Sequence, residues 1–251
     1  MTDRLKRLLG IGVGPGDAEL ITIKAVRALE EADLILVPAA DTSESEVGRA
    51  EAIILESCQN VAGRIQRIPF SMSARRGVDE KRSEAWQTSA DAAVAGFETG
   101  ARTIAFATIG DPSVYSTFSY LADSVRRQIP DLIVEVIPGI TAMQALAAAS
   151  TTPLVEGQEI LALVPVTAGI EAVGRVLDNV DTVVAYKVGR QLEAVFELLV
   201  ERGRDEATVI GVNVGLPDQI VRKLNETSAS PVPYFSTLLV PPSRGETGSR
   251  I

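Results

Sequence analysis

Short apolar runs alternate along the chain with longer segments in which apolar residues recur every three or four positions. The runs are rich in Val, Ile, Leu and Ala, which is typical of strands buried on both faces of a parallel sheet. Strands are predicted at residues 8–13, 33–37, 64–68, 103–107, 133–137, 159–164, 182–186, 207–212 and 235–240. Helices are predicted between them at residues 20–31, 81–99, 116–128, 142–149 and 191–202.

This alternation of strands and helices is typical of an α/β fold with a mostly parallel sheet. The C-terminal third is less regular, and we expect residues 218–226 and 233–240 to be neighbouring extended segments of a mixed second sheet. A complete set of strand–helix units ends near Gly110-Asp111-Pro112, and a new series of strands follows. We therefore predict two α/β domains, residues 1–118 and 119–251.

The composition is that of an ordinary globular protein. The 251 residues, 46% of them hydrophobic, are ample for a core. No apolar run approaches the roughly 20 residues of a membrane span, and the N-terminus does not resemble a secretory signal, so we expect no membrane association. One cysteine, Cys58, excludes an intrachain disulfide and fits a reducing cytoplasm. A small apolar residue in a helix is favoured over a nucleophile for Cys58.

The charge narrows the chemistry further. A net charge of −9 does not favour nucleic acid as a partner. The chain has no histidine, which removes the usual general base near neutral pH and the commonest metal ligand. We predict no metal site. Catalysis must then use carboxylates, Tyr, Lys, Arg, backbone dipoles, or reactivity that a cofactor and a substrate supply.

Two glycine-bearing loops follow predicted strands. The first, residues 10–17, lacks both the G-x-G-x-x-G pattern of dinucleotide-binding folds and the G-K-[ST] ending of a phosphate-binding loop. It either lets backbone N–H groups approach a ligand or makes a tight turn. The second, residues 110–117, either contributes Asp111 to a ligand or makes a turn with Ser116 capping the next helix. Because ligands bind at the carboxyl ends of strands in open α/β sheets, the two loops together suggest one cleft.

The chain resembles the tetrapyrrole (corrin/porphyrin) methylases in several motifs that occur in the family's order. These motifs are Gly12–Asp17, Leu20–Ala25, Gly110–Pro112 and Val136–Ala142. The resemblance implies two α/β domains, a homodimer, and S-adenosylmethionine bound in the crevice between the domains. Residues 110–120, 138–144 and 233–236 are most similar to the branch that methylates C20 of precorrin-2 to give precorrin-3A in cobalamin biosynthesis.

Two other functions stay open at this point. The same carbon could be methylated in cobalt-factor II, the metal-bearing substrate of the oxygen-independent route. The paired loops also fit a nucleotide-binding regulatory module without catalysis.

The resemblance also implies which residues form the site. The implied cofactor contacts are Pro15, Gly110, Asp111, Val114, Ser116, Thr117, Thr141, Ala142, Lys187 and Val214. Lys187 and Val214 depart from the family, because other branches often have Met and Gly there. Pro38 is implied to face the substrate. Tyr115 is the candidate catalytic residue, with Asp111 beside it, for loss of the proton from C20. A water molecule or a substrate carboxylate could take that proton instead, and Tyr115 could be an aromatic residue that only packs.

A basic stretch at residues 64–82 contrasts with the acidic chain. It has six Lys and Arg residues against two carboxylates, a local net charge of +4. Because Arg pairs with carboxylates in a bidentate manner, we predict that Arg75 and Arg76 bind the acidic side chains of a tetrapyrrole substrate. The alternative is a solvated surface, which charge runs usually form.

Overall fold

The first part of the chain is built on a parallel sheet. The computed structural model describes residues 5–40, 47–70, 80–226, 232–233 and 236–244, and the chain divides into two units, Met1–Thr141 and Ala142–Ile251. The described strands of the first unit are β1 Arg7–Gly12, β2 Leu34–Ala40, β3 Ile65–Phe70, β4 Thr103–Thr108 and β5 Ile133–Ile137. They lie in the order β3-β2-β4-β1-β5, and each neighbouring pair is parallel.

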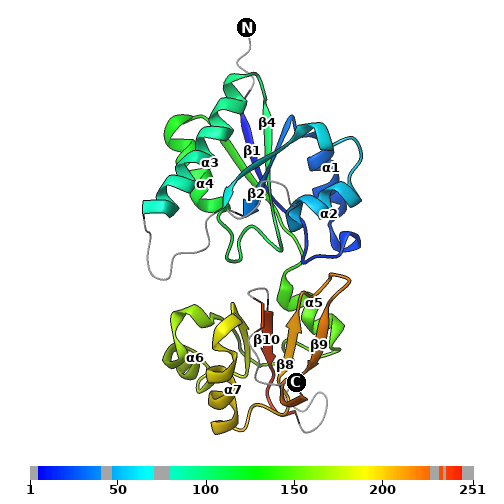
Figure 1. Ribbon diagram of the computed structural model, residues 1–251, viewed down its shortest axis with the longest axis vertical. Helices are drawn as coiled ribbons and strands as arrows, with labels where there is room; N and C mark the ends of the chain where they lie inside the picture. Colours follow the sequence, from blue (N-terminus) through cyan, green and yellow to red (C-terminus); the bar gives the residue numbers. More distant parts are fainter. Residues whose placement is uncertain (1–4, 41–46, 71–79, 227–231, 234–235, 245–251) are drawn as a thin grey trace. The chain divides into compact units, whose positions relative to one another are not determined.

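Helices cover both faces of this sheet (Figure 1). They are α1 Ile23–Glu31, α2 Arg49–Ser57, α3 Glu80–Glu98 and α4 Phe118–Gln128. Alternate residues of a strand point to opposite faces. Leu9 and Ile11 of β1 therefore belong to the core beneath α1 and α2, whereas Leu8 belongs to the core beneath α3 and α4. A strand covered on both sides needs apolar residues at every position, which explains the continuous apolar runs.

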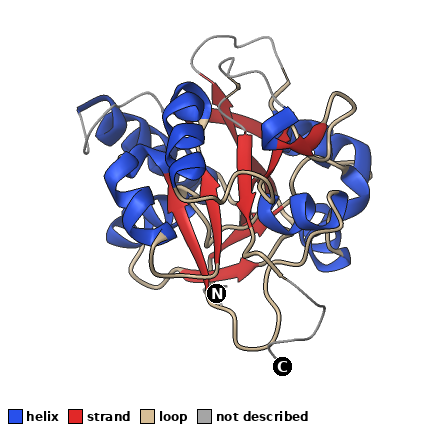
Figure 2. Ribbon diagram, turned by 90° about the horizontal axis from the view of Figure 1, so that it is seen from below, coloured by secondary structure: helices blue, strands red, loops and turns tan. Residues whose placement is uncertain are grey.

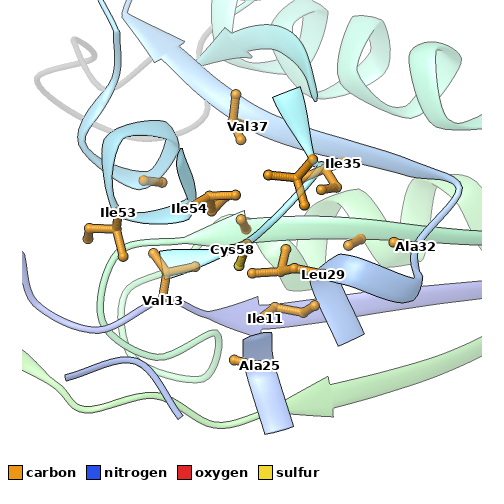
Figure 3. Packing of buried hydrophobic residues seen from close by; sticks show 14 of the residues in the cluster. Ile11, Val13, Ala25, Leu29, Ala32, Ile35, Val37, Ile53, Ile54 and Cys58 are labelled. Atoms are coloured by element: carbon orange, nitrogen blue, oxygen red, sulfur yellow. The ribbon is translucent and has the colours of Figure 1, made fainter. Parts of the chain in front are cut away.

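The core beneath α1 and α2 is a closely packed apolar cluster (Figure 3). Leu29 of α1 and Ile54 of α2 are fully buried there, together with Ile11 and Ile35 of the sheet. Cys58, directly after α2, is buried in the same cluster, as expected for a small apolar residue. Burial also raises the pKa of the Cys58 thiol, which disfavours the nucleophilic thiolate.

The second unit contains a mixed sheet, as predicted. Its helices are α5 Ala142–Ala149, α6 Ile170–Leu177 and α7 Leu192–Glu201, and its strands are β6 Leu161–Pro165, β7 Thr182–Tyr186, β8 Val209–Val212, β9 Ile220–Lys223 and β10 Ser236–Val240. The strand order is β6-β7-β10-β8-β9, with only β6 and β7 forming a parallel pair. The prediction that residues 218–226 and 233–240 are neighbouring segments is wrong. They form β9 and β10, and strand β8 lies between these two strands. Figure 2 distinguishes the helices and strands by colour.

The two faces of the second sheet are covered unequally. Helices α6 and α7 pack on one face, where Val195 and Leu199 contribute to a large apolar cluster. The other face carries a smaller cluster, in which Leu146 of α5 packs with Val184, Val209 and Leu239. Leu146 of α5 is fully buried, and Met143 and Ala147 of the same helix pack against this cluster.

The boundary between the units lies later in the chain than the predicted 118/119. Strand β5 pairs with β1 along its whole length, and α4 packs in the core of the first unit with α3. Residues 119–141 therefore belong to the first unit, which ends at Thr141. The fifth strand completes the first sheet rather than beginning a new one.

Two short helices, α2 and α6, are absent from the sequence-based assignment. Each begins after a glycine that offers no side-chain cap, at Gly48 and Gly169. Without a Ser, Thr, Asp or Asn at the start, the usual signal for a helix N-terminus is missing. Within the described part of the chain, no helix combines the length and the apolar character that crossing a membrane requires.

Candidate functional site

The loops after β1, β4 and β5 begin side by side. The register places Gly12 opposite Thr108 and Ile11 opposite Ile137, at the carboxyl ends of parallel strands. Six of the predicted cofactor contacts in this unit lie in these loops, and Thr117 immediately precedes α4. The loop residues are Pro15, Gly110, Asp111, Val114, Ser116 and Thr141. Pro38 lies within β2, the neighbour of β4. The carboxyl edge of the first sheet thus gathers these predicted site residues of the first unit.

The first two loops are joined by backbone hydrogen bonds. The N–H of Gly110 donates to the carbonyl of Gly14 at 2.8 Å, and the N–H of Gly14 lies 3.4 Å from the carbonyl of Gly110. Gly14 has φ +85° and Gly110 has φ +70°, both in the region that L residues rarely adopt. Glycine at these two positions therefore permits the pairing of the loops.

A close approach of three glycines holds all three loops together. A Cβ added to Gly12 would lie 2.5 Å from the carbonyl oxygen of Gly110 and 2.6 Å from the nitrogen of Gly139. A Cβ added to Gly139 would lie 2.8 Å from the carbonyl carbon of Gly12 and closer still to the Gly110 oxygen. All these neighbours are backbone atoms, so no side chain can move aside. The three glycines form a cradle in which the backbones of the three loops pack directly against one another.

Asp111 fastens the second loop to the third. One carboxylate oxygen accepts hydrogen bonds from the N–H of Ser113 at 2.7 Å and from the Ser113 hydroxyl, and the other accepts one from the N–H of Gly139 at 2.9 Å. The side chain is 7% exposed. Burial alone would raise the pKa of Asp111, but the hydrogen bonds from Ser113 and Gly139 together lower it below its ordinary value. A carboxylate held in this way positions the loops and is a weak base.

The rest of the second loop leads into α4. Ser116 Oγ accepts a hydrogen bond from the N–H of Phe118, the first residue of α4, at 3.2 Å and lies 3.3 Å from Thr108 Oγ1. The N-cap residue is Thr117 rather than the expected Ser116, and Thr117 makes no side-chain cap hydrogen bond. Tyr115 has φ +52° and is 45% exposed. Burial of its hydroxyl raises the pKa of Tyr115, so the phenol keeps its proton at neutral pH. It is therefore a hydrogen-bond donor and a poor acceptor of a proton.

The described part of the basic stretch serves the fold. Arg64 donates to the carbonyls of Glu30 at 2.9 Å and of Ala32, at the end of α1. Arg67 makes a two-pronged ion pair with Glu51, at 2.7 and 3.0 Å. These two arginines are therefore committed to contacts within the protein. Arg75 and Arg76, the predicted substrate contacts, lie outside the described residues.

Three predicted cofactor contacts belong to the second unit. Ala142 is the first residue of α5, Lys187 follows β7, and Val214 follows β8. Both β7 and β8 run antiparallel to β10, so their carboxyl ends share one edge. Gly211 keeps this edge compact, because a Cβ there would lie 2.6 Å from Val214 Cγ2 and 2.7 Å from a methyl group of Leu146. The second unit therefore brings its own subset of predicted contacts to one end of its sheet.

Sequence reasoning omitted several residues that shape these loops. Gly12 and Gly139 lie within the motifs that resemble the methylase family, but they were not among the predicted site residues. A glycine at the end of a buried strand is a usable signal of close backbone approach. Ser113 bonds Asp111, two residues before it in the same loop. Tyr186 accepts a hydrogen bond from Met143 on another segment, and no local pattern marks that partner.

Comparison with known proteins gives matches over almost the whole chain. The model of the family described as Tetrapyrrole (Corrin/Porphyrin) Methylases matches residues 7–229. A precorrin-2 C(20)-methyltransferase from a Sinorhizobium species is 33% identical over 94% of this chain and 95% of its own. A cobalt-precorrin-2 C(20)-methyltransferase from Salmonella typhimurium is 30% identical over 93% of this chain and 95% of its own.

Solved structures share the fold at lower sequence identity. A cobalt precorrin-4 methyltransferase superposes with a TM-score of 0.66 at 19% identity, covering 94% of each chain. A uroporphyrin-III C-methyltransferase from Thermus thermophilus, complexed with S-adenosyl homocysteine, gives a TM-score of 0.63 at 20% identity, covering 93% of this chain and 96% of its own. These likenesses establish a common two-domain α/β architecture.

Proposed function

The chain belongs to the tetrapyrrole (corrin/porphyrin) methylase family, and from this premise we propose that it transfers a methyl group from S-adenosylmethionine to C20 of precorrin-2. The product would be precorrin-3A, an intermediate of cobalamin biosynthesis. The main support is the 33% identity to a precorrin-2 C(20)-methyltransferase over nearly the full length of both chains. Metal-free precorrin-2 is proposed ahead of cobalt-factor II, since the cobalt-precorrin-2 relative is slightly less similar.

The glycine cradle fits the proposed cofactor. Gly12, Gly110 and Gly139 let three loops pack closely at the carboxyl edge of the first sheet, which is where ligands bind in open α/β folds. Asp111 holds the second and third loops in register through its bonds to Ser113 and Gly139. We propose that the other cofactor contacts follow the family, with Pro15, Val114, Ser116, Thr117 and Thr141 from the first unit and Ala142, Lys187 and Val214 from the second.

The reaction requires mainly positioning from the protein. Bound S-adenosylmethionine supplies an activated sulfonium methyl, and the meso carbon of a reduced tetrapyrrole is an enamine-like nucleophile. Holding two reactants in line can lower a barrier by roughly 7–11 kcal/mol, so the absence of histidine is no obstacle. Tyr115 is the proposed catalytic side chain. Because the phenol keeps its proton, we propose that it donates a hydrogen bond to the substrate. The S–CH3 bond breaks as the C20–CH3 bond forms, S-adenosylhomocysteine leaves, and the C20 proton passes to water or to a substrate carboxylate.

The function is tested by anaerobic incubation of the purified protein with S-adenosylmethionine and metal-free precorrin-2, followed by mass spectrometry and NMR. We expect a gain of one methyl group, located at C20. A parallel incubation with cobalt-factor II distinguishes the two routes, because transfer to that compound alone would reassign the substrate. Binding of S-adenosylhomocysteine without transfer to either compound would favour a regulatory module.

Replacement of Arg75 and Arg76 by Ala is expected to raise the KM for precorrin-2 about tenfold or more, because two bidentate partners for its acidic side chains are lost. The affinity for S-adenosylhomocysteine should stay within about twofold of wild type. Arg126→Ala with Arg127→Ala is the matched control, since this adjacent pair is exposed in the last turn of α4. Equal KM values for the two double variants would refute the assignment.

We also infer a homodimer located in the cytoplasm. The dimer follows from the resemblance to the family, and the location is supported by the buried free thiol of Cys58 and by relatives named for cobalamin biosynthesis. Light scattering during size-exclusion chromatography should give a mass twice the chain mass of 26.6 kDa. A mass equal to that of one chain would contradict the dimer.

A further inference from the structure

Tyr186, the last residue of β7, links two segments of the second unit through its side chain. Its hydroxyl accepts a hydrogen bond of 3.0 Å from the backbone N–H of Met143, the second residue of α5. The first N–H groups of a helix have no partner within the helix, so a hydroxyl at this place satisfies one of them. The end of β7 is thereby fastened to the first turn of α5.

Each end of this hydrogen bond adjoins a proposed cofactor contact. Ala142 precedes Met143, and Lys187 follows Tyr186. Lys187 has φ +61°, a conformation that a non-glycine residue keeps only when its surroundings hold it. The bond therefore fixes two residues that are far apart in sequence and that are both proposed to contact the same ligand.

The ring of Tyr186 is part of the same arrangement. Tyr186, Met143 and Val214 all pack against the apolar cluster that contains Leu146 and Leu239. The third proposed contact of this unit, Val214, is thus held by the cluster that holds the Tyr186 ring. Removal of the hydroxyl alone would leave this packing in place and remove the hydrogen bond from Met143.

We propose that Tyr186 is a positioning residue for the methyl donor. Its hydroxyl keeps the first turn of α5 and the residue after β7 at the separation that the ligand requires. This inference rests on the proposed use of S-adenosylmethionine. It assigns a role in ligand binding to a side chain that neither motif nor composition singles out.

The test is Tyr186→Phe, with Tyr120→Phe as the matched control. Tyr120 lies in α4, is 49% exposed, and stacks on Trp86 at 4.3 Å between ring centroids, a contact that Phe preserves. Titration calorimetry with S-adenosylhomocysteine should show about fivefold to twentyfold weaker binding to Tyr186→Phe and unchanged binding to Tyr120→Phe. The KM for S-adenosylmethionine should rise by the same factor, while the KM for precorrin-2 and kcat stay within about twofold.

A purely structural role would give a different result. In that case the melting temperature of the ligand-free protein would fall and both KM values would rise together, whereas we expect the ligand-free melting temperature to stay within about 2 °C of wild type. Wild-type affinity in Tyr186→Phe would overturn the inference and leave the proposed function intact. Failure of the wild-type protein to bind S-adenosylhomocysteine would instead overturn the proposed function.

Discussion

Gly139→Ala is expected to weaken binding of S-adenosylhomocysteine by about 100-fold or more and to destabilise the first unit. The added methyl group would lie 2.8 Å from the carbonyl carbon of Gly12 and closer still to the carbonyl oxygen of Gly110. Real Cβ atoms do not approach backbone this closely, so the loops after β1, β4 and β5 must separate. Overpacking of this kind costs about 1–3 kcal/mol. The loops proposed to contact the cofactor would then lose their placement relative to one another.

The control for this variant is Gly63→Ala, which makes the same chemical change in open space. A Cβ at Gly63, in the short 3-10 turn 62–64, meets nothing within 4 Å, and the residue is not among those with positive φ. Titration calorimetry and thermal melts should therefore show near wild-type behaviour for Gly63→Ala. Similar affinities for Gly139→Ala and wild type would mean that the cradle does not determine binding at this edge.

Most strands of the fold could be predicted from their short runs of apolar residues. The ranges 133–137, 182–186 and 142–149 coincide with β5, β7 and α5 as observed. The assignment of β5 to a sheet could not be predicted in the same way. Its partner in the sheet is β1, which is far from it in the sequence. The local pattern of apolar residues is the same whichever sheet a strand joins. The misplaced domain boundary follows directly from this.

The candidate site shows the same division between local and long-range information. The glycine loops were predicted, because each follows a buried strand at the carboxyl edge. The roles of Asp111 and Arg64 were not, since each depends on hydrogen bonds to backbone groups distant in sequence, at Gly139 and at the end of α1. Asp111 was expected to contact the cofactor, and its carboxylate accepts hydrogen bonds from Ser113 and from the backbone of Gly139. Arg64 belongs to a stretch of which part was expected to bind the substrate, and it donates to backbone carbonyls at the end of α1.

Asp111→Asn is expected to lower the melting temperature by roughly 5–10 °C and to weaken S-adenosylhomocysteine binding at neutral pH. Three donors converge on the carboxylate, from Ser113 N–H, Ser113 Oγ–H and Gly139 N–H. An amide has one acceptor oxygen, so its NH₂ group must face at least one of these donors. Hydrogen bonds to a charged group are worth about 1.5–3 kcal/mol, and this buried site offers little compensation from water. Asp123→Asn, in an exposed position of α4, is the control.

The effect of Asp111→Asn should depend on pH in a defined direction. Because the hydrogen bonds from Ser113 and Gly139 outweigh burial and lower the pKa of Asp111 in the folded protein, its carboxylate stabilises the fold above the unfolded-state pKa of about 3.9. That contribution is lost as the pH falls through the lowered pKa of the folded state. Thermal melts should therefore show the full difference in melting temperature between wild type and Asp111→Asn at neutral pH. This difference should become smaller below about pH 4. A difference in melting temperature that stays constant down to acidic pH would show that the charge of Asp111 does not hold the loops together.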